Sequence, residues 1–267
     1  MSGKLTPSRA SQEMLVRAHL ARKLLLDSSR FEEDFGMRKL TSLMLLVVAA
    51  QLCGCVATAR NPEGAVAKPS PRIVAGDVEI SNQTSLRAFE NLEIVTGTLT
   101  IAGNTRLRSL DGLERLRAVR QLVIKENLAL EDTQALAGLR NARSVVIQGN
   151  PRLESVRGFE SLKALDRLIV TDNGIFCTTG FGGLTRVGQL VVTRNARLLS
   201  LRGFSRLESA GSVVIADNPR IVPETGFLSD LRRVSGAVEV RRNAGIEPRH
   251  IRLLERRIQR PITVAAR

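Results

Sequence analysis

Acidic side chains are the first candidates for chemistry in this sequence, because two converging carboxylates can serve as a general acid and a general base. The acids are isolated residues such as Asp111, Asp172 and Asp217. Asp172 and Asp217 occupy the same position in a repeat described below, but two repeats apart, which is roughly 10 Å at the spacing of β-strands. We therefore expect no catalytic residues; a polysaccharide-active β-helix enzyme is a less favoured alternative.

Thiol chemistry is the second possibility, since the chain contains Cys53, Cys55 and Cys177. Cys177 lies far along the chain from the other two, and no histidine in the repeats could activate it as a nucleophile. One isolated thiol cannot form an intramolecular disulfide. We expect Cys177 to be a half-buried structural residue, and we expect neither a metal site nor a cofactor.

An asparagine returns in one sequence frame along most of the chain, for which Leu122-Val123-Ile124-Lys125-Glu126-Asn127 is the reference copy. The recurring residues are Asn104, Asn127, Asn150, Asn173, Asn195, Asn218 and Asn243. A period of roughly 20–29 residues with leucines and an asparagine is typical of a solenoid built from stacked coils.

The residues five and three before each asparagine are apolar, as Leu122 and Ile124 are before Asn127. Period two predicts a strand that points these side chains inward. An asparagine at the end of such a strand can bond to turn backbone that would otherwise be buried without partners, and stacked coils can share those bonds. We predict a structural ladder of buried asparagines, not a catalytic or metal-binding array.

The rest of each coil follows a similar order. A core residue such as Leu130 comes three residues after the asparagine, on a second short strand or turn. Gly-Leu or Gly-Phe follows in most coils, as in Gly158-Phe159, and the glycine permits a turn that other residues disfavour. A further leucine such as Leu162 indicates a short helical turn.

The full pattern, Gly-x-Leu-x-Ile-x-x-Asn-x-x-Leu-x-Ser-Leu-x-Gly-Leu-x-x-Leu, resembles the receptor L-domain family. These are the leucine-rich-repeat-like ligand-binding domains of insulin and epidermal growth factor receptors. The resemblance covers about Ile73 to Gly245 and implies a right-handed parallel β-solenoid with short helical turns, which we assign to residues 73–246. It does not imply a particular ligand, because the receptors' cysteine-rich modules and kinase are absent.

Residues 247–267 follow as a predicted capping helix and tail. Pro248 fits the first turn of a helix, and Ile251, Leu254 and Ile258 share one face of it. A solenoid needs its open end covered, which favours a cap. Contact with anionic lipid or a polyanion is the alternative role for the basic face: Arg249, Arg252, Arg256 and Arg257.

Residues 37–54 are organised like a secretory signal peptide. Met37-Arg38-Lys39 precedes an apolar run, Leu43 to Ala50, which is too short for a stable transmembrane anchor. Leu52-Cys53-Gly54-Cys55 resembles the bacterial lipobox, although Cys53 replaces the usual Ala or Ser. The resemblance implies cleavage before Cys55 and attachment of lipid to its thiol.

The segments around this signal complete the expected organisation. Residues 1–36 do not fit the start of a signal peptide, so we interpret them as an extension upstream of a natural start at Met37, without a packed domain. Residues 55–72 contain Pro and Gly and predict a flexible tether. Val56 is not the Asp that retains enterobacterial lipoproteins at the inner membrane, which favours a lipid anchor in the outer membrane of a bacterial cell envelope.

The net charge is +14, but the arginines are scattered along the sequence, and the chain has no Trp and no Tyr. Nucleic-acid binding normally shows a basic stripe on a known fold or aromatic stacking platforms, so we expect no nucleic-acid partner. The missing aromatics also argue against sugar binding. A membrane contact through Cys55 and an unknown protein or surface ligand remain as partners.

One outward row of the predicted sheet is apolar. The residue four before each asparagine lies between two inward residues and must point out. On consecutive coils it is Val123, Val146, Ile169, Val191 and Val214. The flanking positions are polar: Gln121, Ser144, Arg167, Gln189 and Ser212 on one side, and Lys125, Gln148, Thr171 and Thr193 on the other.

An apolar strip with a polar rim indicates a partner-binding surface. The structural alternative is that β-branched residues favour strands wherever they sit. We therefore expect a membrane-anchored bacterial surface lipoprotein whose solenoid is a protein- or ligand-binding module. The alternative is a passive envelope lipoprotein without a specific ligand.

Overall fold

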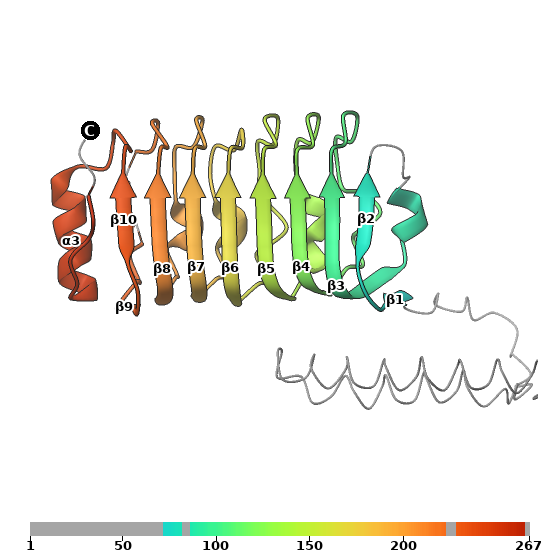
Figure 1. Cartoon of the computed structure of the whole chain (residues 1–267), viewed down its shortest axis with the longest axis horizontal. Coiled ribbons are helices and arrows are strands. Elements are labelled where there is room, and N and C mark those ends of the chain that lie inside the picture. Colours follow the sequence, from blue (N-terminus) through green and yellow to red (C-terminus); the bar gives the residue numbers. More distant parts are fainter. Residues whose placement is uncertain (1–71, 82–85, 223–227, 265–267) are drawn as a thin grey trace, which may run out of the picture. The chain divides into compact units, whose positions relative to one another are not determined.

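The computed structural model describes residues 72–81, 86–222 and 228–264. Within them the chain forms the predicted parallel β-solenoid, followed by one helix (Figure 1). The strands are β1 (Arg72–Val74), β2 (Val78–Ser81), β3 (Leu92–Ala102), β4 (Ala118–Lys125), β5 (Asn141–Gln148), β6 (Ala164–Thr171), β7 (Arg186–Thr193), β8 (Ser209–Ala216), β9 (Arg233–Val234) and β10 (Val238–Arg241).

Successive coils place their strands side by side in one ten-stranded sheet with the order β1-β3-β4-β5-β6-β7-β8-β10. All pairings are parallel, as a solenoid requires, because every coil crosses the sheet in the same direction. At each end of the sheet one coil contributes a broken strand: β1 and β2 both pair with β3, and β9 and β10 both pair with β8.

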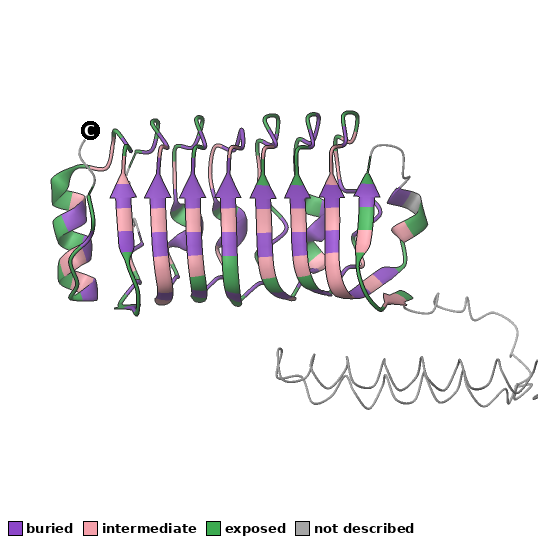
Figure 2. Cartoon of the chain, viewed as in Figure 1, coloured by how far each residue is buried: buried purple, intermediate pink, exposed green. Residues whose placement is uncertain are grey.

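The strands alternate between buried and less buried residues, as Figure 2 shows. The rows five and three before each asparagine are buried, as Leu122 and Ile124 illustrate. These side chains belong to one continuous apolar core from Ile80 to Ile262. The predicted inward rows are therefore confirmed, and the sheet forms one wall of the core.

The opposite wall is made of short helical turns and hydrogen-bonded loops. The 3₁₀ helices are η1 (Leu86–Phe89), η2 (Gln134–Gly138), η3 (Thr179–Phe181) and η4 (Arg202–Phe204). Phe159, Phe181 and Phe204 stack along this wall, with ring centroids 5.2 and 5.7 Å apart. Their neighbouring glycines allow close packing of coils, because a Cβ on Gly180 would lie 1.7 Å from the carbonyl oxygen of Val156.

The segment after each asparagine, where a second short strand or a turn was predicted, forms mostly turns. Among the described residues it contributes only isolated parallel bridges, Ser155 to Cys177 and Cys177 to Ser200. Cys177 is half-buried there, and its Sγ lies 3.3 Å from Thr179 Oγ1. Cys177 is therefore part of the packed wall of the solenoid and half-buried, as we predicted for a structural residue.

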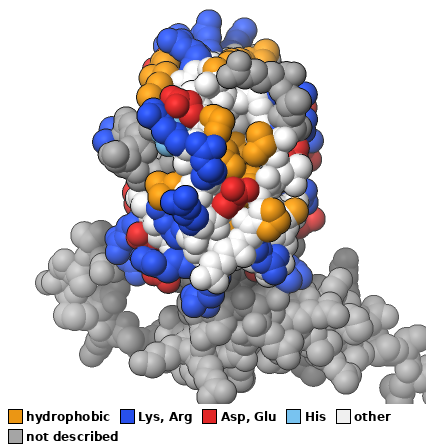
Figure 3. All heavy atoms as spheres, turned by 90° about the vertical axis from the view of Figure 1, so that its left-hand side faces the viewer, with side chains coloured by type: hydrophobic (Ala, Val, Ile, Leu, Met, Phe, Trp, Pro, Cys, Tyr) orange, Lys and Arg blue, Asp and Glu red, His pale blue; other side chains and the backbone are white. Residues whose placement is uncertain are grey.

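The C-terminal end of the solenoid is covered by α3 (Pro248–Ile258), which buries Ile251, Leu254 and Ile258. Glu247 caps this helix, since its side chain accepts a bond from the first turn while His250 Nδ1 accepts the N–H of Glu247. After the helix, Thr263 bridges to Glu239 of β10. The predicted cap is therefore present. Figure 3, which faces this end, shows Lys and Arg side chains gathered over it.

Candidate binding face

The outward row four residues before the asparagines is continuous across the sheet. Val123 pairs with Val146, Val146 with Ile169, Ile169 with Val191, and Val191 with Val214. Thr100 precedes the row and Glu239 follows it, so polar side chains bound it at both ends. The apolar stripe, as we call Val123, Val146, Ile169, Val191 and Val214, is about 19 Å long at a strand spacing of about 4.8 Å.

All residues of the apolar stripe are half-buried. On one side lies a continuous polar row, in which Gln121 pairs with Ser144, Ser144 with Arg167, Arg167 with Gln189, and Gln189 with Ser212. The sheet therefore presents an apolar row to solvent directly beside amide, hydroxyl and guanidinium groups. The five apolar side chains therefore form one continuous row and are not scattered singly over the surface.

The other flank differs in part from the sequence-based prediction. Lys125 and Gln148 are exposed, but Thr171 and Thr193 are buried, with 5% and 8% of their surface accessible. Their hydroxyl oxygens lie 2.9 Å apart, and the Thr171 hydroxyl also donates to the carboxylate of Asp172. The two hydroxyl groups hydrogen-bond to each other and are buried, so these threonines do not form part of an accessible polar rim.

Each of the seven ladder asparagines is preceded by a residue with a left-handed backbone, which follows directly after the strand. The φ angles there are positive throughout, for example 65° at Gly103, 55° at Glu126 and 54° at Arg194. This conformation turns the next residue into the core. It is costly for side chains other than glycine. These positions share no residue type that the sequence could reveal, because Gly, Glu, Asp and Arg all occur at them.

The asparagines use that turn to form a ladder through the core, and every one of the seven is at most 7% exposed. Asn127 Oδ1 accepts from the backbone N–H and the side-chain Nδ2 of Asn104. Asn127 in turn donates from its backbone and its Nδ2 to Asn150 Oδ1, at 3.0 and 3.2 Å. The same Nδ2 group also bonds to the carbonyl of Ile101. The side chains thus satisfy strand-end backbone groups of neighbouring coils.

The acids singled out from the sequence are used in ion pairs and turns. Arg194 donates to both oxygens of Asp172, at 2.8 and 2.7 Å, and Arg242 likewise binds Asp217. These hydrogen bonds hold the pKa of both carboxyls below the usual range, so both acids are ionised at neutral pH. Asp111 accepts a bond from Ser109. Neither Asp172 nor Asp217 has the raised pKa of a general acid.

The described residues bring together no group of His, Cys, Asp and Glu that could hold a metal ion. The one histidine among them, His250, belongs to the cap of α3. Cys177 lies in the wall of the solenoid, on the segment before η3.

Several predicted features lie outside the described residues. These are Cys55, the signal segment 37–54, the upstream residues 1–36 and most of the tether 55–72. In the part of the chain that is described, α3 and the shorter helices are not of a length and hydropathy that would cross a bilayer.

Comparison with known proteins agrees with this geometry. Residues 72–181 match the model of the receptor L domain, a family of non-enzymatic binding domains. The match runs from β1 to η3, and the later coils continue the same ladder and the same stripe. No curated protein and no solved structure matches the chain.

Proposed function

We propose that this chain is a binding module of the bacterial cell envelope that takes a protein partner on the outer face of its sheet. The single observation that supports this most strongly is the apolar stripe, since solvent favours polar side chains at outward positions of a sheet. Val146, Ile169 and Val191 instead stand side by side in register and half-buried.

A partner could cover this surface without any change in the fold. The strands beneath it are held by backbone pairing and by the asparagine ladder, and neither depends on the outward side chains. Binding on a rigid, preformed face avoids the entropic cost of ordering loops. The apolar stripe would supply the buried centre of the contact, and Gln121, Ser144, Arg167, Gln189 and Ser212 would supply a polar rim.

Crosslinking from intact cells tests this role. A bait that retains Cys55 is expected to capture its partner, and Val146→Glu with Val191→Glu should abolish that capture while the fold stays intact. A matched control is Leu128→Glu with Val222→Glu, which changes two apolar residues that are 52% and 60% exposed on loops after the asparagines. Capture at wild-type strength by both double variants would show that the apolar stripe reflects only the preference of β-branched residues for strands.

The proposal includes a lipid anchor at Cys55 in the outer membrane. Its support is the segment from Met37 to Cys55, with its basic start, its apolar run and its lipobox-like end. Labelling of cells with a palmitate analogue should mark the wild-type protein but not Cys55→Ser. Equal labelling of the two would remove the anchor from the proposal. Fractionation of the labelled cells would distinguish the inner from the outer membrane.

A further inference from the structure

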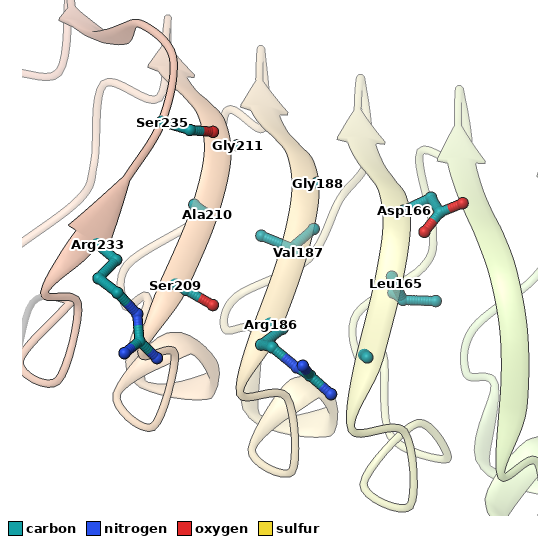
Figure 4. Close-up of a pocket in the computed structure, with 11 residues that line it drawn as sticks. Leu165, Asp166, Arg186, Val187, Gly188, Ser209, Ala210, Gly211, Arg233 and Ser235 are labelled. Atoms are coloured by element: carbon teal, nitrogen blue, oxygen red, sulfur yellow. The ribbon is translucent and has the colours of Figure 1, made fainter. Parts of the chain in front are cut away.

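An open groove of about 500 Å³ crosses the outer face of the sheet between β6 and β9 (Figure 4). It lies nearer the starts of the strands than the apolar stripe does. Between the two runs one outward row, which includes Gln189 and Ser212. Along a strand, the separation from Gly188 to Val191 is three residues, or about 10 Å.

The groove results from a local change in the strands. In each of β4 to β8, two consecutive residues point outward between two inward residues, as between Val119 and Leu122 in β4. The first of these two outward residues is, from β4 to β8, Arg120, Arg143, Asp166, Gly188 and Gly211. A Cβ on Gly211 would lie 2.2 Å from the carbonyl oxygen of Gly188, so this position requires glycine. The two glycines leave a floor of bare backbone where the earlier coils carry long side chains.

Two arginines stand along the edge of this floor. Arg186 of β7 pairs with Ser209 of β8, which pairs with Arg233 of β9, so the hydroxyl lies between the two guanidinium-bearing residues. Both arginines are exposed, and Figure 4 shows them extending toward the strand starts on the same side of the groove. Their backbones are two coils apart, roughly 10 Å, which two arginine side chains can span.

The charge of the groove is not balanced within the described residues. Asp166 is the one acid among the lining residues, and Arg143 already binds it with Nε 2.7 Å from Oδ2. Neither Arg186 nor Arg233 forms an ion pair with another residue that the structure describes. Arg260 adds a further positive charge at the far end, where it donates to the carbonyl of Ser235.

We propose that this groove binds a carboxylate side chain of an acidic polypeptide, held over Ser209 between Arg186 and Arg233. Guanidinium groups match the planar carboxylate with paired, charge-assisted hydrogen bonds. This inference rests on the proposed function and names the chemistry of its partner: acidic residues over the groove, and apolar residues about 10 Å away on the apolar stripe.

A polypeptide fits this surface better than an acidic sugar polymer does. The chain has no Trp and no Tyr, and none of the described residues that line the groove is aromatic, so the groove offers no stacking platform for a sugar ring. A polypeptide can also carry apolar side chains to the valines beside the groove. The groove and the apolar stripe together therefore select for a partner that combines carboxylates with aliphatic groups.

Fluorescence anisotropy on the full chain tests the inference with a labelled peptide of alternating Glu and Leu. The peptide should bind, and added salt should weaken the binding because the contacts are exposed charges. Arg186→Ser with Arg233→Ser should weaken it about tenfold. Arg206→Ser with Arg220→Ser, which removes two exposed arginines away from the sheet, should leave it unchanged.

Equal binding by the Arg186→Ser, Arg233→Ser variant, or by a peptide with Gln in place of Glu, would overturn the inference. So would polygalacturonate that binds more tightly than the Glu-Leu peptide and depends on the same arginines, since the ligand would then be an acidic sugar. If the groove variant keeps its peptide affinity while the Val146→Glu, Val191→Glu variant loses cellular capture, the groove inference fails and the proposed function stands. If cellular capture also persists in the stripe variant, both fail.

Discussion

Arg194, one coil after Asp172, donates two hydrogen bonds to its carboxylate: Nε to Oδ1 at 2.8 Å and Nη2 to Oδ2 at 2.7 Å. Both residues have a left-handed backbone, at φ 54° and 57°, and both precede a ladder asparagine. The ion pair therefore joins two turns whose conformations are each costly for residues other than glycine. Arg242 and Asp217 repeat the arrangement on later coils.

Removal of the Asp172 charge should reduce stability at neutral pH but not in acid. The bonds from Arg194 lower the pKa of Asp172 in the folded state, so the ion pair stabilises the fold above the pKa of the unfolded chain. That contribution is lost as the pH falls through the lowered pKa. Since the side chains are 56% and 39% exposed, we expect Asp172→Asn to cost only a few tenths of a kcal/mol at pH 7.

Urea unfolding at pH 7 and at a pH below the lowered pKa measures this difference. Asparagine tolerates positive φ, so the substitution leaves the turn unstrained. A gap between variant and wild type that persists unchanged in acid would assign the effect to something other than the charge.

Loss of a central ladder residue should cost more than loss of any surface residue of the sheet. Asn150 Oδ1 accepts from Asn127, and its Nδ2 donates to the carbonyls of Ile124 and Gln148. Asn150→Ala leaves these buried groups without partners, which should cost about 1–3 kcal/mol. Gln148→Ala on the exposed flank serves as the control, with an expected change within about 0.5 kcal/mol in urea unfolding. Coincident melts for Asn150→Ala and wild type would contradict the ladder's role.

Two glycines should respond to alanine for different reasons. Gly149 has φ 68°, and its nearest neighbour for a new Cβ is Glu126 Cγ at 3.5 Å, so Gly149→Ala costs only backbone strain, about 1 kcal/mol. Gly149→Asn should cost less, because asparagine visits this conformation more readily. Gly180→Ala should cost about 3 kcal/mol, since its Cβ would overlap the carbonyl oxygen of Val156. Thermal unfolding of the three variants gives the order, and equal losses for the two alanine variants would refute it.

The middle ring of the phenylalanine stack should be the most sensitive core position of the helical wall. Phe181 is fully buried and stacks on Phe159 and Phe204. Phe181→Ala should cost about 3–5 kcal/mol from the cavity and the lost ring contacts. Phe176→Ala is the comparison, because that ring is half-buried under the guanidinium of Arg197 and should cost about 1–2 kcal/mol. Circular dichroism in urea measures both, and a smaller loss at Phe181 would be incompatible with this packing.

The inward rows could be predicted from the sequence because each position keeps one type of side chain in every coil. Leu122 and Val145, or Ile124 and Ile147, repeat the same apolar choice. The left-handed positions could not be predicted in this way, since Gly103, Glu126 and Arg194 share no chemistry. What they share is a backbone conformation, and the buried asparagine that follows imposes it.

The groove could not be predicted from the sequence for a related reason. A strand with strict alternation would bury every second residue, whereas Val119 and Leu122 are both buried with two outward residues between them. The arginines that are scattered in the sequence come together here because stacked coils place their strands side by side in register. Arg186 and Arg233 are 47 residues apart by number, yet both flank Ser209 in the sheet.

The asparagine ladder also makes the solenoid extensible. Each asparagine from Asn104 to Asn218 donates to the side-chain oxygen of the asparagine in the next coil, and Asn243 is the last acceptor. Duplication or deletion of the residues from Leu128 to Asn150 would restore the same register on both sides, because any asparagine can bond to any other. Insertion of whole coils would lengthen the outward rows in step, so the size of the surface offered to a partner can change by unit increments while the rules that fold each unit stay constant.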